Sequence, residues 1–170
     1  HERRRQLLLP ALEVAPGITR IESILGPRPF SQYLLHDERS MLVDTGVKET
    51  PADVILPALA GHTADFVLVS HADVDHFGGT AAILEAMPGA LVCASALDSA
   101  WIEDADLIMR ERYGWYDAFG IGYDAETATW LRNAMGPCVP VDLRLRGGEV
   151  FRLGPELAVV VQLAVVDEHV

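Results

Sequence analysis

The chain is organised around one stretch, Phe66-Val-Leu-Val-Ser-His-Ala-Asp-Val-Asp-His-Phe-Gly-Gly-Thr80. Its apolar beginning, 66–69, is typical of a buried strand, and 80–87 has the spacing of a helix that Pro88-Gly89 ends. We expect Gly78-Gly79 to release the backbone from the loop into this helix. The loop carries four side chains that can bind a metal ion: His71, Asp73, Asp75 and His76.

The position of these four residues favours a metal site. Loops at the carboxyl ends of strands in an open α/β sheet can point several side chains at one spot. Imidazole and carboxylate together suit zinc, iron or manganese. A single His or Asp would more often be a surface or capping residue. Four such residues within one short loop favour a metal site over that structural alternative.

The motif resembles the signature of the metallo-β-lactamase superfamily, His-x-His-x-Asp-His followed by Gly-Gly. The chain reads His71-Ala-Asp73-Val-Asp75-His76-Phe-Gly78-Gly79, so Asp73 stands where the family has its second His. Upstream, Leu42-Val-Asp44-Thr-Gly46 resembles the family's Asp-x-Gly element, and the hairpin at 33–43 resembles its entry. The resemblance implies a single domain, 1–170, with a partial αββα sandwich that corresponds to the family's amino-terminal half.

The resemblance also implies one or two divalent metal ions, with zinc the first expectation and iron or manganese the alternatives. His71 and Asp73 would hold the first ion, and Asp75 and His76 would face the second. Asp75 would also orient the attacking hydroxide and is the expected catalytic residue. Asp44 would support the ligands without binding metal. The Asp73 carboxylate is a harder donor than imidazole, so it should favour iron or manganese, or eliminate one site.

Composition limits the classes of partner. The chain has 170 residues, half of them hydrophobic, which is enough for about one domain with a real core. Its net charge of −12 opposes binding to nucleic acid or anionic membranes, unless a basic patch or the metal inverts the local field. No apolar run reaches the roughly 18 residues of a membrane span, so a cytoplasmic location is the default expectation.

The remaining pattern predicts an α/β fold. A strand is expected at 17–24, a hairpin at 30–43, and a helix from Thr50-Pro51 to Gly61, shortened or kinked by Pro57. Two crossover units, 41–70 and 66–93, imply parallel pairing of their strands. A helical insertion is expected at about 95–136, with helices at 99–110 and 126–135. Strands in 141–162 would begin a second sheet.

The insertion contains an aromatic and glycine-rich segment, 112–123. Ordinary packing is one explanation of so many aromatic residues. The other is a lid or pocket wall over the metals, since glycine-flanked aromatic loops can close over a site and exclude water. The lid candidates are Tyr113, Trp115, Tyr116 and Phe119.

Three functions remain open. The leading one is a metal-dependent hydrolase acting on an ester, lactone, thioester or amide carbonyl of a small-molecule substrate. The second is a catalytically degenerate binding module that keeps the fold. The third is a nuclease or phosphodiesterase, which the net charge opposes. The substrate, the metal and a homo-oligomeric state are not determined by the sequence.

One feature of the carboxyl-terminal region departs from the family pattern. The run 157–166 is almost unbroken and apolar, whereas the family interrupts this strand with a Pro-Gly-His turn that brings in a ligand. We predict that the protein contains a short additional segment between Leu163 and Ala164. Its intact mass should then exceed that of the sequence shown, and equal masses would contradict this prediction. His169 is the alternative third ligand.

Overall fold

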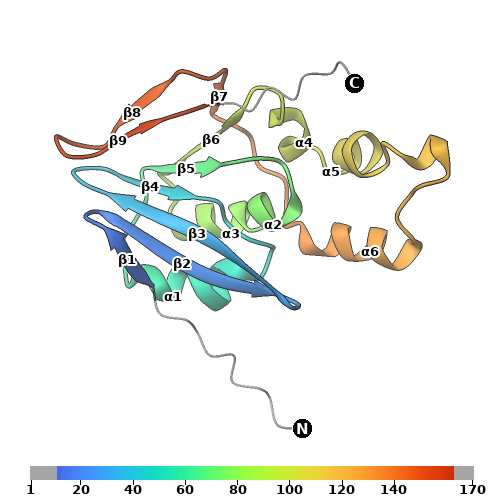
Figure 1. Ribbon diagram of the computed structural model, residues 1–170, viewed down its shortest axis with the longest axis horizontal. Helices are drawn as coiled ribbons and strands as arrows, with labels where there is room; N and C mark the ends of the chain where they lie inside the picture. The colour runs from blue at the N-terminus through green and yellow to red at the C-terminus, as the bar shows by residue number, and fades with distance from the viewer. Residues whose placement is uncertain (1–10, 163–170) are drawn as a thin grey trace, which may run out of the picture.

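A mixed sheet of seven strands in the order β1-β2-β3-β4-β5-β6-β7 forms the centre of the fold (Figure 1). The computed structural model describes residues 11–162. The predicted extra segment after Leu163 and the alternative ligand His169 lie outside these residues. The strands of the sheet are β1 (Leu12–Ala15), β2 (Ile18–Leu25), β3 (Arg28–His36), β4 (Ser40–Val43), β5 (Phe66–Val69), β6 (Leu91–Ser95) and β7 (Leu143–Leu145).

The sheet changes from antiparallel to parallel pairing at β4. Strands β1 to β4 form an antiparallel meander, as the predicted hairpin required. Strands β4, β5, β6 and β7 pair in parallel, because helical crossovers connect them. The carboxyl ends of the last four strands therefore lie along one edge. The segment 70–76, which carries the four candidate ligands and is called the ligand loop, begins at this edge.

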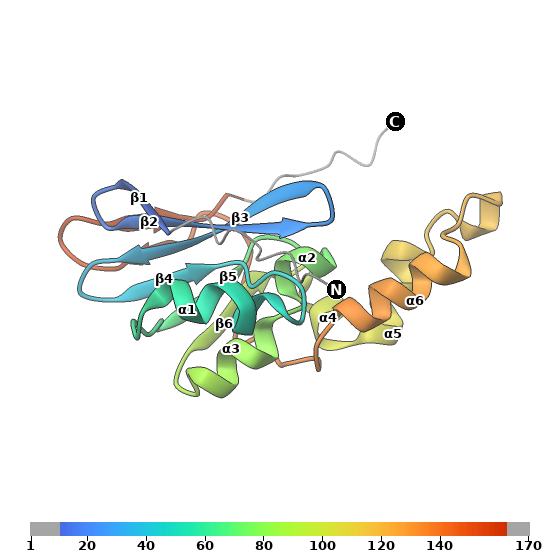
Figure 2. The ribbon, with the colours of Figure 1, turned by 90° about the horizontal axis from the view of Figure 1, so that it is seen from below.

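Helices cover one face of this sheet (Figure 2). They are the π-helical turn η1 (Pro51–Ile55), α1 (Leu56–Leu59) and α3 (Thr80–Ala86). The switch from η1 to α1 comes just before Pro57, the residue expected to kink the predicted helix. The apolar core beneath them consists mainly of Ile21, Leu34, Leu42, Ile55, Leu59, Val67 and Ile83. None of the helices within 11–162 has the length and apolar character to cross a bilayer.

A second, two-stranded sheet packs beside the first, formed by β8 (Val150–Arg152) and β9 (Ala158–Val160). The Phe151 ring meets Phe66 of β5 edge to face at 5.2 Å. This arrangement confirms the predicted α/β class and the start of a sandwich. One detail of the prediction was wrong: β7 belongs to the first sheet, because the chain returns from the helical insertion to pair in parallel with β6.

The helical insertion lies beyond the carboxyl-end edge of the sheet, where its helices pack on α2 (Val74–Phe77) and the ends of β5 and β6. It contains α4 (Ser99–Glu103), α5 (Ala105–Ile108), the turns η2 (Met109–Tyr113) and η3 (Asp117–Phe119), and α6 (Ala125–Ala134). The helix expected at 99–110 is broken because Asp104 is extended and accepts hydrogen bonds from two N–H groups of α5. Figures 1 and 2 show α5 and α6 extending away from the sheet.

The two glycines after the ligand loop have a different role from the predicted one. Gly78 and Gly79 have ordinary right-handed backbone angles, so they do not release the chain from a turn. They allow three segments to approach closely. A Cβ at Gly79 would overlap the Thr45 carbonyl oxygen and the Pro51 ring, and one at Gly78 would lie 2.6 Å from the Ala134 carbonyl oxygen.

We expect Gly79→Ala to lower the free energy of unfolding by about 1–3 kcal/mol, because the added methyl group overpacks this contact. Gly89→Ala is the matched control: no heavy atom lies within 4 Å of the position that its methyl group would take. It should leave stability unchanged or raise it by up to about 1 kcal/mol. Urea denaturation of both variants measures the difference. Equal stabilities would contradict the close-approach explanation.

Candidate metal centre

The carboxylate of Asp44 joins the ends of two neighbouring strands. Asp44 follows β4, and Ser70 follows β5. Asp44 Oδ1 accepts the Ser70 backbone N–H at 2.8 Å, and Oδ2 accepts the Ser70 hydroxyl at 2.8 Å. Oδ2 also lies 2.8 Å from His76 Nδ1. A buried carboxylate with these partners fixes the beginning of the ligand loop relative to His76.

Asp44 also affects the pKa and the tautomer of His76. Burial lowers the pKa of His76, but the hydrogen bond and negative charge of Asp44, together with the charges of Asp75 and Asp73, outweigh this effect, so the pKa lies above its usual value. With Asp44 accepting from Nδ1–H, a neutral His76 carries its lone pair on Nε2. That atom faces Asp75, whose Oδ2 lies 3.7 Å away. His76 and Asp75 thus form one pair of donors.

His71 and Asp73 form a second pair. His71 Nε2 lies 3.2 Å from Asp73 Oδ2, while His71 Nδ1 lies 3.0 Å from the Ser70 hydroxyl. The rings of His71 and His76 are adjacent, with centroids 3.9 Å apart. All four predicted ligands are therefore grouped after the end of β5. Their predicted placement on a loop was wrong for Asp75 and His76, which lie in the short helix α2 that begins at Val74. The side chains of His71, Asp73 and Asp75 are between 33% and 41% exposed, so solvent reaches them.

Asp73 has an additional partner that the sequence did not predict. Arg112, in η2, directs Nε and Nη2 at Asp73 Oδ1, each at 2.9 Å. The hydrogen bond to His71 lowers the pKa of Asp73 most, burial opposes it, and the contacts with Arg112 lower it further. Asp73 is therefore ionised at neutral pH, with one oxygen bound to arginine and the other toward His71.

These distances fit parts of a metal site. Ligand atoms about 2.0–2.1 Å from a tetrahedral zinc ion are about 3.3 Å apart, close to the separations within both pairs. Within residues 11–162, however, no group of three or more His, Cys, Asp or Glu side chains converges as a metal site. The two pairs, His71 with Asp73 and His76 with Asp75, each offer two donor atoms. A complete site requires further donors.

The four residues predicted as a lid lie in two different environments. The Tyr113 hydroxyl accepts the Val74 backbone N–H at 2.9 Å, which places it directly against the ligand loop. Trp115, Tyr116 and Phe119 are 67%, 58% and 73% exposed. They belong to the segment between α5 and α6, at the end of the insertion (Figure 1). Their closure over the loop stays a prediction.

Two residues at this centre were missed by the sequence analysis, Ser70 and Arg112. Ser70 could have been suspected, because it separates a buried strand from the first ligand. Arg112 is 39 positions from Asp73, and no local pattern connects them. The only signal was chemical: a carboxylate in place of an imidazole adds a charge that a cation elsewhere can balance.

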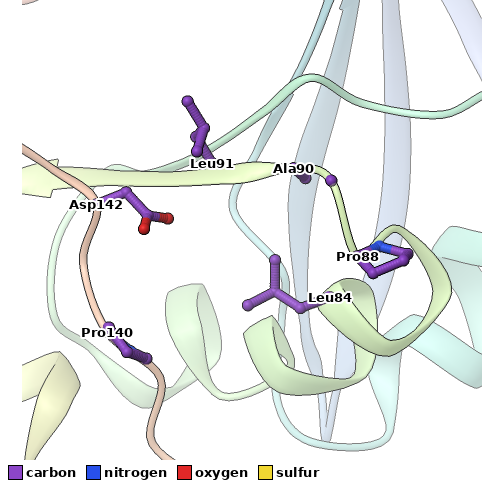
Figure 3. Close-up of a pocket in the computed structure, with 7 residues that line it drawn as sticks. Leu84, Pro88, Ala90, Leu91, Pro140 and Asp142 are labelled. Carbon is purple, nitrogen blue, oxygen red and sulfur yellow. The ribbon is translucent and has the colours of Figure 1, made fainter.

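A separate hollow of about 360 Å³ lies at the amino-terminal end of β6 (Figure 3). Its lining is mainly apolar, and includes Leu84, Leu91 and Pro140. Asp142 is its acidic residue, and it already accepts the Val92 backbone N–H at 2.8 Å. The ligand loop follows the opposite end of the parallel strand β5, so this hollow is not part of the candidate metal centre.

We expect Asp44→Asn to lower the free energy of unfolding by about 1–3 kcal/mol, because an amide cannot accept all the hydrogen bonds that the carboxylate accepts. Asp53→Asn, at an exposed position of η1, is the control and should change stability by less than about 0.5 kcal/mol. Chemical denaturation of the metal-free proteins measures both. A neutral effect of Asp44→Asn would contradict its role in joining the strands.

Comparison with solved structures supports the fold. A metallo-β-lactamase from Cronobacter sakazakii with a HARLDQ motif, in mutant form, superposes with a TM-score of 0.61 at 24% identity, over 86% of this chain and 51% of that one. FEZ-1 from Legionella gormanii superposes with a TM-score of 0.61 at 18% identity, over 85% of this chain and 49% of that one. MEM-A1 from a soil metagenome superposes with a TM-score of 0.59 at 23% identity, over 86% of this chain and 49% of that one. The chain spans about half the length of these proteins.

Comparison with family models gives the assignment. No curated protein matches the chain. The model of the metallo-beta-lactamase superfamily matches residues 25–161, which include the central sheet from β3 onward, the ligand loop and the helical insertion. The chain belongs to the metallo-beta-lactamase superfamily.

Proposed function

We propose that this protein is a metal-dependent hydrolase that acts on an ester, lactone, thioester or amide carbonyl. One observation carries the proposal: His76 Nε2 and Asp75 Oδ2 face each other at 3.7 Å, beyond the length of a good hydrogen bond. Asp44 already occupies the other nitrogen of His76. The remaining lone pair and the carboxylate are thus available to the same cation, at a spacing that fits metal ligands.

Each side chain of the loop has an assigned part in this proposal. His71 and Asp73 would hold one ion, and Asp75 and His76 a second. When bound, the ions would make hydroxide available near neutral pH and polarise the substrate carbonyl. Asp75 would also orient the hydroxide by accepting its hydrogen bond. Asp44 and Ser70 would hold the two imidazoles in place, without contact with the substrate.

The variant motif is compatible with this assignment. The HARLDQ motif named for the Cronobacter protein has the same first, second and fifth letters as residues 71–76, and Arg at the third position. The third position is therefore not invariably His among similar folds. His169, which lies outside residues 11–162, stays the predicted third donor. Zinc remains the first expectation, with iron or manganese as alternatives.

We expect the chain to bind a divalent ion, and His76→Ala to weaken this binding by at least about tenfold, since changes even to outer partners of a site cost 10–100-fold. His62→Ala is the control, because the exposed His62 contacts the Leu59 carbonyl oxygen and not the ligand loop. Metal analysis after purification without added metal, followed by chelator competition, measures both variants.

The same preparations test the reaction. Hydrolysis of a chromogenic ester, thioester or β-lactam that stops with a chelator and returns with metal would support the hydrolase. Metal binding without turnover would favour the non-catalytic binding module instead. Cleavage of a phosphodiester probe in place of the carbonyl substrates would favour the nuclease or phosphodiesterase alternative. Equal metal affinity in His76→Ala and wild type would exclude the proposed site.

A further inference from the structure

Asp73 lies at the start of α2 but does not act as a helix cap. Its backbone is extended, with φ −95° and ψ 142°, as expected for the residue before a helix. An Asp at this position normally accepts a backbone N–H of the first turn. The Asp73 carboxylate makes no such bond. The Tyr113 hydroxyl accepts the N–H of Val74, the first residue of α2. Capping therefore does not explain the orientation of Asp73.

Arg112 determines which oxygen of Asp73 remains available. Both guanidinium contacts go to Oδ1, from Nε and Nη2 at 2.9 Å. Oδ2 faces His71 Nε2 at 3.2 Å. The carboxylate is thus held so that a single oxygen points to the neighbouring imidazole. The guanidinium is itself positioned over the Trp101 ring, 5.6 Å from its centroid.

The ion pair of Arg112 with Asp73 also balances the charge that Asp73 adds to the loop. Asp73 introduces a negative charge near two further carboxylates, those of Asp75 and Asp44. Arginine is permanently charged, so the Asp73–Arg112 pair has a formal charge of zero, as a neutral imidazole has. One directed donor atom and no net charge are the two properties that a neutral histidine would bring to this position.

We propose that Arg112 is a positioning residue that makes Asp73 a one-oxygen, charge-balanced donor toward the ion beside His71, and so sets the metal preference of this position. The inference rests on the proposed metal site. Without Arg112, Asp73 is an uncompensated carboxylate free to offer both oxygens. Compared with Asp73 held by Arg112, such a donor should raise the affinity for manganese relative to that for zinc, because hard anionic oxygen ligands favour harder ions.

The test measures the ratio of the manganese Kd to the zinc Kd by competition with a chromophoric chelator. In Arg112→Met this ratio should fall at least about tenfold, the lower end of the usual effect of an outer partner. The control is Arg110→Met, in the same turn, whose exposed side chain contacts Glu111. Its ratio should change less than about twofold. A general loss of folding would weaken the binding of zinc and of manganese by the same factor and would leave the ratio of the two Kd values unchanged.

A second background tests whether Arg112 acts through Asp73. In Asp73→His the charge to be balanced is gone, so adding Arg112→Met should change the ratio by less than about twofold. If Arg112→Met still binds both metals as tightly as wild type with an unchanged ratio, or if the ratio falls equally in the Asp73→His background, the inference is overturned while the metal site stays intact. Failure of wild type to bind either ion would overturn the metal site and this inference with it.

Discussion

The structure at the end of the sheet depends on one interaction, the contact of the Asp44 carboxylate with Ser70 and His76. Its oxygens accept three hydrogen bonds across β4 and the loop after β5. Asp44 has φ 63°, in the left-handed region where Asp and Asn are tolerated better than most residues. A backbone conformation of this kind persists where the surroundings over-determine it, as these hydrogen bonds do.

A second constraint connects the helical insertion to the ligand loop. Arg112 and Tyr113, adjacent in η2, contact Asp73 and the Val74 N–H respectively. The insertion therefore does more than enlarge the domain, because it supplies the partners that the start of α2 lacks. The apolar core between α2 and helices α4 to α6 holds η2 at this position. Packing between the insertion and α2 thus fixes the orientation of the Asp73 side chain.

Sequence patterns were most informative where their causes are local. The alternation in β2, the polar hairpin before β4 and the apolar run of β5 predicted the strands, and the crossovers predicted their parallel pairing. The pattern was less informative where distant segments compete. It did not reveal that Asp104 would break the helix expected at 99–110, nor that β7 would return to the first sheet. Both depend on how the insertion packs.

The sequence by itself determined the fold class and the positions of the four candidate ligands, because strand periodicity and the spacing from 71 to 76 are properties of a short segment. Only the tertiary structure decided how those side chains are arranged. It paired His71 with Asp73 and His76 with Asp75, and placed Arg112 against Asp73 from 39 positions away. Hydrogen bonds between remote residues follow from packing of the whole chain, and no local pattern encodes them.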